Sequence, residues 1–166
     1  MDLSTCEMDS PLGRLLLTAG CRGLCRLQIG PDSSCTGPES TDTGPILRAA
    51  AIQLQAYFAG ERTCFDLPLD LSGLTPFTQQ VLTSLQTIPM ATTISYGELA
   101  AFVGKPRAAR AVGRVMAINP LPLIIPCHRV VGGDGAMVGY SGGGGVATKM
   151  WLLAFEKQVV GRIQPD

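Results

Sequence analysis

The residues best suited to chemistry are Cys127 and His128, which are neighbours in the segment Pro126-Cys-His-Arg-Val130. His128 is the only histidine of the chain. A thiol becomes a strong nucleophile when it loses its proton, and an adjacent base or imidazolium can lower its pKa. The pair therefore predicts nucleophilic chemistry at sulfur. The competing interpretation is a cysteine that only fills the core beside a hydrogen-bonded histidine.

The residues before this pair must position it. The apolar run Leu121–Ile125 predicts a buried strand that carries Cys127 into a shielded site. Because neighbouring residues on a strand point to opposite faces, a direct bond between the Cys127 and His128 side chains would be strained. A bridging water, or a turn that begins at Pro126, would let the thiol and the imidazole exchange a proton.

Length and composition limit the class of protein. A chain of 166 residues is long enough for one domain or two small ones, and an apolar content of 46% suits a globular core. The sequence has no run of about 18 apolar residues and no basic-then-apolar leader. We therefore expect an intracellular protein without a membrane partner, and we also expect it to be a monomer. In that setting the six cysteines are expected to be reduced thiols.

The net charge of zero conceals an asymmetry between the two halves. Residues 1–75 carry five Lys/Arg and nine Asp/Glu, whereas residues 76–166 carry eight Lys/Arg and four Asp/Glu. No acidic residue lies between Glu98 and Asp134. The basic residues of that span indicate either a nucleic-acid-binding surface or a solvated helix face; they are Lys105, Arg107, Arg110, Arg114 and Arg129.

The pattern of apolar residues and turn residues predicts two domains. In residues 1–74 we expect a small α/β domain with a hairpin over 12–29, a mobile loop over about 30–45, a helix over 46–58 and a strand within 64–71. In residues 75–166 we expect mainly helices. The spacing predicts one helix from Pro76 to about residue 88 and a second that begins at a capping box of Ser95 and Glu98 and ends at Gly104. A third helix is expected over 107–118. A fourth is expected over 146–157, with Trp151, Leu152 and Phe155 packed inward. The second and third of these helices have the spacing of a helix-turn-helix.

The longer motifs around the cysteine resemble one known family. They are Arg107-Ala-Ala-Arg-Ala-Val-Gly113, Asn119-Pro120, Ile125-Pro-Cys-His-Arg-Val-Val131, Tyr140-Ser-Gly-Gly143, and Trp151-Leu-Leu-Ala154 followed by Glu156. Together they are similar to the active-site region of the O(6)-alkylguanine-DNA alkyltransferases, also called methylated-DNA–protein-cysteine methyltransferases. The N-terminal segments Cys6-Glu-Met8 and Asp9-Ser-Pro-Leu-Gly13 resemble the vertebrate-type members. The resemblance covers most of the chain and is weak only between about residues 31 and 45.

The resemblance implies DNA repair by direct reversal. The enzyme would transfer an alkyl group, usually methyl, from O(6)-alkylguanine in duplex DNA to its own Cys127, with O(4)-alkylthymine as a second substrate. Each molecule would act once, without a cofactor. The resemblance assigns the chemistry to Cys127 as acceptor, His128 as base, Glu156 as the group that orients the imidazole, and Asn119 as a hinge. It assigns substrate binding to Tyr140, Ser141, Val130 and Pro122.

The same resemblance implies how DNA is bound. The second helix of the helix-turn-helix would enter the minor groove, and the alkylated base would be flipped out of the duplex. Arg110 would enter the space that the base leaves, and Tyr96 would meet the 3′ phosphate. The small residues Ala109, Ala111 and Gly113 would allow close approach, and Arg114 stands where the family has a small residue. The location would be the nucleus in a eukaryote and the cytoplasm otherwise.

The sequence departs from the family pattern at the zinc site and at a loop, and it leaves two other functional interpretations open. Cys6 and Cys21 match the two cysteines of a vertebrate zinc site, Cys25 falls near the position of one of its histidines, and the fourth ligand is missing. The alternatives are a three-cysteine zinc site with another ligand or three free thiols. The loop Gly142–Gly145 is two residues longer than in the family. A non-catalytic sensor of alkylated bases would lack Cys127, and a thiol hydrolase would not need an arginine-bearing helix-turn-helix.

Overall fold

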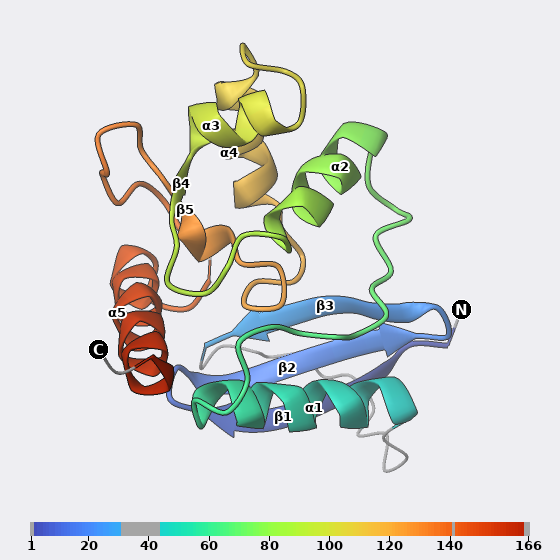
Figure 1. The fold of residues 1–166 in the computed structure, drawn as a ribbon. Helices are drawn as coiled ribbons and strands as arrows, with labels where there is room; N and C mark the ends of the chain where they lie inside the picture. Colours follow the sequence, from blue (N-terminus) through green and yellow to red (C-terminus); the bar gives the residue numbers. More distant parts are fainter. Residues whose placement is uncertain (1, 31–43, 141, 165–166) are drawn as a thin grey trace. The chain divides into compact units, whose positions relative to one another are not determined.

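The computed structural model describes residues 2–30, 44–140 and 142–164, and Figure 1 shows its fold. Ser141 and most of the expected loop over 30–45 lie outside these ranges. The chain divides into two compact units, Met1–Gly73 and Leu74–Asp166. The first unit is a sheet with a helix and the second is mainly helical, so the mixed α/β fold class is confirmed.

The first unit is built on a three-stranded antiparallel sheet in the order β1-β2-β3. Its strands are β1 (Ser4–Ser10), β2 (Gly13–Gly20) and β3 (Gly23–Ile29). The predicted hairpin corresponds to β2 and β3. Strand β1 was not predicted, because its polar and half-exposed sequence gives a weak apolar signal. Residues 64–71 form no regular strand. They pair with the sheet only through an isolated bridge between Leu24 and Leu69.

One helix, α1 (Pro45–Phe58), lies against this sheet (Figure 1). Its buried residues recur at helical spacing: Leu47, Ala50, Leu54 and Tyr57. They pack with the buried leucines of β2 to form the core of the unit. The segment around Pro68 and Leu69 passes close to the start of β3. A glycine is needed at position 23, because a Cβ atom there would lie only 2.6 Å from the carbonyl oxygen of Pro68.

The second unit begins with three helices, and their starts follow from local chemistry. Thr75 caps α2 by accepting a hydrogen bond from the backbone N–H of Thr78. Ser95 and Glu98 form the predicted capping box of α3. The helices are α2 (Pro76–Leu85), α3 (Tyr96–Phe102) and α4 (Ala109–Ala117). Helix α2 ends at Leu85 rather than at Pro89, and α4 is one to two residues shorter at each end than expected.

The segment before the cysteine is not the predicted strand. Residues 121–125 form turns, and they lead into a 3-10 helix, η1 (Cys127–Arg129). Pro120, Pro122 and Pro126 lack the N–H groups that a sheet would require, and Leu123 has a positive φ of 73°. The alternative of a turn at Pro126 is therefore confirmed. A short strand, β5 (Val130–Val131), follows and pairs in parallel with β4 (Ile94–Ser95).

The last helix, α5 (Val146–Ile163), extends six residues beyond the predicted end. No proline interrupts residues 158–163, so nothing local stops the helix. Leu152 is fully buried as expected, but Trp151 is 39% exposed, so its predicted inward packing is wrong. Within the described ranges, no helix is both long enough and apolar enough to cross a membrane.

Candidate active site

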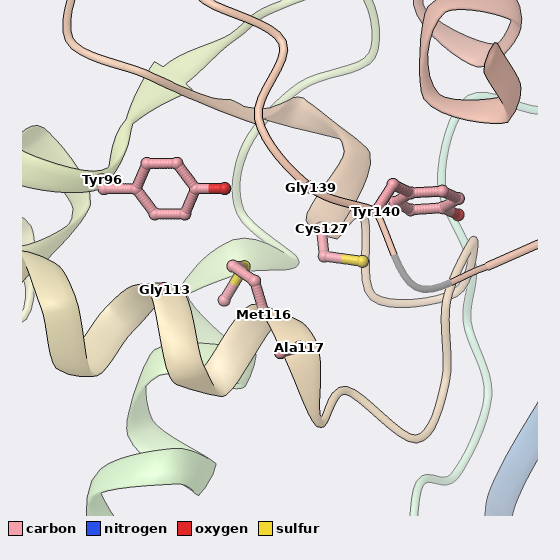
Figure 2. Close-up of a pocket in the computed structure, with 7 residues that line it drawn as sticks. All are labelled: Tyr96, Gly113, Met116, Ala117, Cys127, Gly139 and Tyr140. Atoms are coloured by element: carbon pink, nitrogen blue, oxygen red, sulfur yellow. The ribbon is translucent and has the colours of Figure 1, made fainter. Parts of the chain in front are cut away.

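Cys127 lies at a cavity of about 270 Å³ within the second unit. Figure 2 shows Tyr96 extending its hydroxyl from α3 toward the side where Cys127 and Tyr140 lie, above helix α4. The lining residues are Tyr96, Gly113, Met116, Ala117, Cys127, Gly139 and Tyr140. Sequence analysis missed Met116, Ala117 and Gly139. The signal for the first two was available, because residues 113, 116 and 117 share one face of α4.

The Cys127 side chain is 4% exposed. Burial raises the pKa of its thiol, although the Asn119 side chain and the charge of Lys149 act in the opposite direction. The resting group is therefore the protonated thiol rather than a thiolate. A nucleophilic reaction at this sulfur must include transfer of the thiol proton to a base.

The candidate base is part of a buried pair. The Nε2 atom of His128 lies 2.7 Å from Oε1 of Glu156, and both side chains are fully buried. Burial lowers the pKa of His128, although its hydrogen bond with Glu156 acts upward. The imidazole is therefore neutral and able to accept a proton. Its other ring nitrogen, Nδ1, is buried and has no hydrogen-bond partner among the described residues.

Glu156 also binds Arg129, which was expected from the sequence to belong to a basic surface but is buried in the structure. The Nη2 atom of Arg129 donates to Oε1 of Glu156 at 2.7 Å, and its Nε atom donates to Oε2 at 3.1 Å. Oε2 also accepts from the backbone N–H of Ala91 at 3.1 Å. Burial alone would raise the pKa of Glu156, but the hydrogen bonds from His128 and Arg129 hold it well below its ordinary value. The carboxyl group is therefore ionised inside the protein.

Asn119 connects the end of α4 to the cysteine segment. Its Nδ2 atom donates to the carbonyl oxygen of Ile125 at 3.0 Å, and its Oδ1 atom accepts from the backbone N–H of Leu121 at 3.0 Å. The side chain is buried, so both of these bonds are shielded from water. This geometry fixes the irregular turn that the prolines create.

Two further groups surround the sulfur. The hydroxyl of Tyr140 is buried without a hydrogen-bond partner in the described structure. Burial, followed by the influence of Cys127 and Glu156, raises the pKa of this hydroxyl, so it remains a proton-bearing donor. Lys149, which sequence analysis missed, donates from Nζ to the carbonyl oxygens of Val130 at 2.5 Å and Val138 at 3.0 Å. Lys149 thereby connects the segment that follows Cys127 to the loop segment that precedes Tyr140.

The remaining substrate-binding predictions are less direct. Pro122 and Val130 are buried, and neither is among the residues that line the cavity. Val130 meets Lys149 through its backbone carbonyl. Ser141 lies outside the described residues.

The residues expected to meet DNA lie on and beside α4. Arg110 and Arg114 are exposed and one turn apart, so they share a face of the helix. A Cβ atom built at Gly113 would lie 3.8 Å from the Tyr96 ring, so α3 and α4 pack closely at this glycine. Ala109 and Ala111 are partly buried on the same helix. Lys105 and Arg107 border a shallow hollow at the turn between the two helices.

Cys6, Cys21 and Cys25, which were candidates for a zinc site, do not form a metal-binding cluster in the structure. Cys6 lies in β1, Cys25 lies in β3, and Cys21 is exposed between β2 and β3. The described residues contain no cluster of three or more His, Cys, Asp or Glu side chains that could hold a metal ion. Cys25 donates to the carbonyl oxygen of Thr18 instead. The donor set therefore does not fit a zinc ion.

Known protein families match nearly the whole chain. Residues 7–71 match the model described as "6-O-methylguanine DNA methyltransferase, ribonuclease-like domain", and residues 76–158 match the DNA-binding domain of the same enzyme. A methylated-DNA–protein-cysteine methyltransferase of Mycobacterium leprae is 47% identical over 159 residues, which cover 93% of this chain and 92% of the relative. The enzyme of that name from Mus musculus is 42% identical, and the match covers 92% of this chain and 82% of the relative.

Solved structures agree with these matches. The crystal structure of Mycobacterium tuberculosis O6-methylguanine methyltransferase is 42% identical, with a TM-score of 0.80 over 95% of this chain and 94% of that chain. The Mycobacterium tuberculosis protein in complex with DNA is 43% identical, with a TM-score of 0.78 over 95% and 93% of the two chains. These findings support DNA binding and DNA repair by alkyl transfer. The chain therefore belongs to the 6-O-methylguanine DNA methyltransferase family, and it is an enzyme of the methylated-DNA–protein-cysteine methyltransferase class.

Proposed function

We propose that this protein transfers an alkyl group from O(6)-alkylguanine in duplex DNA to Cys127, with O(4)-alkylthymine as a second substrate. The observation that carries the proposal is the placement of Cys127 at a cavity, beside the buried His128–Glu156 pair. His128 would take the thiol proton at Nδ1, the only ring nitrogen not bonded to Glu156. A water between the two side chains would serve as the path.

The chemical step then balances in one displacement. The Cys127 sulfur forms a bond to the alkyl carbon while the bond between that carbon and oxygen 6 of guanine breaks. The electron pair of the broken bond goes to the guanine, where the Tyr140 hydroxyl would stabilise the developing negative charge as a donor. The proton that His128 took from the thiol would then pass to the guanine anion, so the products are an S-alkylcysteine, an unmodified guanine and a neutral imidazole. The remaining substrate contacts are proposed for Ser141, Val130 and Pro122 by resemblance alone.

The DNA would be bound through the minor groove by α3 and α4 acting as a helix-turn-helix. The exposed arginines of α4 and the small residues beside them support this proposal. Arg110 would fill the gap left by the flipped base, Tyr96 would meet the 3′ phosphate, and Arg114 would add a phosphate contact. A monomer would suffice, and it would act where the genome lies: the nucleus of a eukaryotic cell or the cytoplasm of a bacterium.

Intact-mass measurement tests the proposed function directly. Incubation with a duplex that contains one O(6)-methylguanine should add about 14 Da, the mass of one methylene unit, to the protein at Cys127. The control is the same duplex with unmodified guanine. Binding without a mass gain would indicate a sensor of damaged bases, and hydrolysis of an ester substrate without such a gain would indicate a thiol hydrolase. Either result would contradict the proposal.

Arg110→Ala should slow repair of duplex DNA at least about tenfold but leave the reaction with free benzylguanine unchanged. Base extrusion costs a few kcal/mol, and losing about 1.4 kcal/mol of compensation corresponds to tenfold in rate. Single-turnover rates on both substrates are the measurement. The matched controls are Arg114→Ala, which should weaken DNA binding and its salt dependence, and Arg162→Ala at the exposed end of α5. Equal losses on both substrates would exclude the proposed role of Arg110.

Each molecule should act once and then be less stable. Breaking the strong carbon–sulfur bond of the product would need a second acceptor thiol, and the described residues that line the cavity include no cysteine besides Cys127. The retained group crowds a sulfur that is already buried, which typically costs about 1–3 kcal/mol. Benzylated protein should therefore melt several degrees below the free protein. Cys127→Ala treated in the same way is the control. An unchanged midpoint, or removal of more than one methyl group per molecule, would contradict this prediction.

A further inference from the structure

Arg129 is a buried cation for which the proposed proton transfer has no role. It follows His128 in η1, and its side chain is almost inaccessible to water. Besides its two bonds to Glu156, the Nη1 atom donates to the carbonyl oxygen of Ile88 at 2.5 Å. The guanidinium is therefore bonded through three nitrogens and cannot rotate away from the carboxylate without breaking buried bonds.

These bonds determine how Glu156 meets the imidazole. Oε1 faces both Nε2 of His128 and Nη2 of Arg129 at 2.7 Å. Oε2 accepts from Arg129 and from the N–H of Ala91, a non-glycine residue with a positive φ of 62°. An ionised carboxylate can only accept, so Nε2 of His128 must carry the proton. The lone pair of the neutral ring then lies on Nδ1.

Arg129 also balances the charge of Glu156. Among the described residues, Glu156 and Lys149 on α5 are the other charged groups that act on His128, and Tyr140 interacts with Glu156. Glu156 is the anion bonded to the ring. Without the arginine, its charge would act on His128 with less opposition and would favour the imidazolium, which has no lone pair on Nδ1.

We propose that Arg129 is a positioning residue for alkyl transfer: its bonds keep Glu156 ionised and oriented, and thereby keep His128 neutral with the acceptor lone pair on Nδ1. The proposal rests on the proposed transfer to Cys127. Arg129 itself exchanges no proton and touches no substrate atom.

Nitrogen NMR can test the first part in the unaltered protein, because His128 is the only histidine. With ¹⁵N-labelled histidine, the wild-type spectrum should show one neutral tautomer with the proton on Nε2. The tautomer with the proton on Nδ1, or an imidazolium at pH 7.5, would overturn the proposal. This measurement needs no substrate, so its outcome is independent of whether the proposed function holds.

Arg129→Met tests the second part. The pKa of His128 should rise, so the acid limb of the reaction with free benzylguanine should move to higher pH. The rate at pH 6 relative to pH 8 should fall about tenfold further than in the wild type. A structural role alone would lower stability or lower the rate equally at all pH values. An unmoved acid limb in folded Arg129→Met would overturn the proposal.

Arg129→Lys decides the question if the methionine variant does not fold. Lysine keeps the positive charge but cannot bond both carboxylate oxygens as the planar guanidinium does. The NMR titration of His128 should therefore move in the same direction by a smaller amount. A titration identical to that of the wild type would overturn the proposal. A wild-type protein that gains no methyl group would refute the proposed function, whatever the titrations show.

Discussion

Replacement of Cys127 by alanine is expected to abolish alkyl transfer completely. Cys127 is the cysteine at the cavity, and the other cysteines in the described structure lie in the first unit at partly or fully exposed positions. No other described thiol is placed beside a buried base. DNA affinity should remain unchanged, because the arginines expected to meet DNA are on α4. The measurements are intact mass after incubation with methylated duplex and a binding titration on the same duplex.

Two controls make this result specific. Cys64→Ala removes an exposed thiol and should transfer the alkyl group at the wild-type rate. Cys127→Ser keeps a small polar group, but a hydroxyl is a much weaker nucleophile, so it should also be inactive. A mass gain at any other residue of the Cys127→Ala variant would overturn the assignment of the acceptor.

Replacement of Glu156 by glutamine is expected to affect both stability and chemistry. The change keeps the shape of the side chain but leaves the buried guanidinium of Arg129 without its counter-charge. Breaking such a pair by removing one partner typically costs about 3–5 kcal/mol of unfolding free energy. The transfer rate should also fall by about 10²–10⁴, the usual range for the loss of general acid–base assistance. Urea unfolding and single-turnover kinetics measure the two effects.

The pH dependence of stability provides a second readout. Because folding lowers the pKa of Glu156, its contribution is fully present above the ordinary carboxyl pKa of about 4.3 and is lost as the pH falls toward the folded value. Glu156→Gln should lack this loss. The exposed change Glu61→Gln is the control and should match the wild type.

A double variant tests the ion pair itself. Arg129→Met combined with Glu156→Gln should be more stable than Glu156→Gln alone, because the double variant buries no unpaired charge. If Glu156→Gln alone is as stable as the wild type, the stabilising role of the buried pair is contradicted.

The sequence was sufficient for features that depend on neighbouring residues. The capping box at Ser95 and Glu98 and the proline start of α2 follow local rules, and the structure confirms both. The adjacency of Cys127 and His128, together with the motifs around them, was enough to identify the family. The strand expected over Leu121–Ile125 failed because apolar content was weighed above the missing N–H groups of the prolines.

The pairing of Glu156 with His128 was expected from the family resemblance, but only the tertiary structure decided how the other polar groups pair in the interior. Glu156 is 28 positions from His128, and Ala91 is 65 positions from Glu156, so no local periodicity relates them. Nothing in the sequence distinguishes Lys149 from an exposed helix lysine. In the structure it is buried, and its ammonium group donates to the carbonyl oxygens of Val130 and Val138. The protonation states follow from the same cause. Burial removes water from Cys127, His128 and Glu156, and the partners that replace that water determine which of these groups carries a charge.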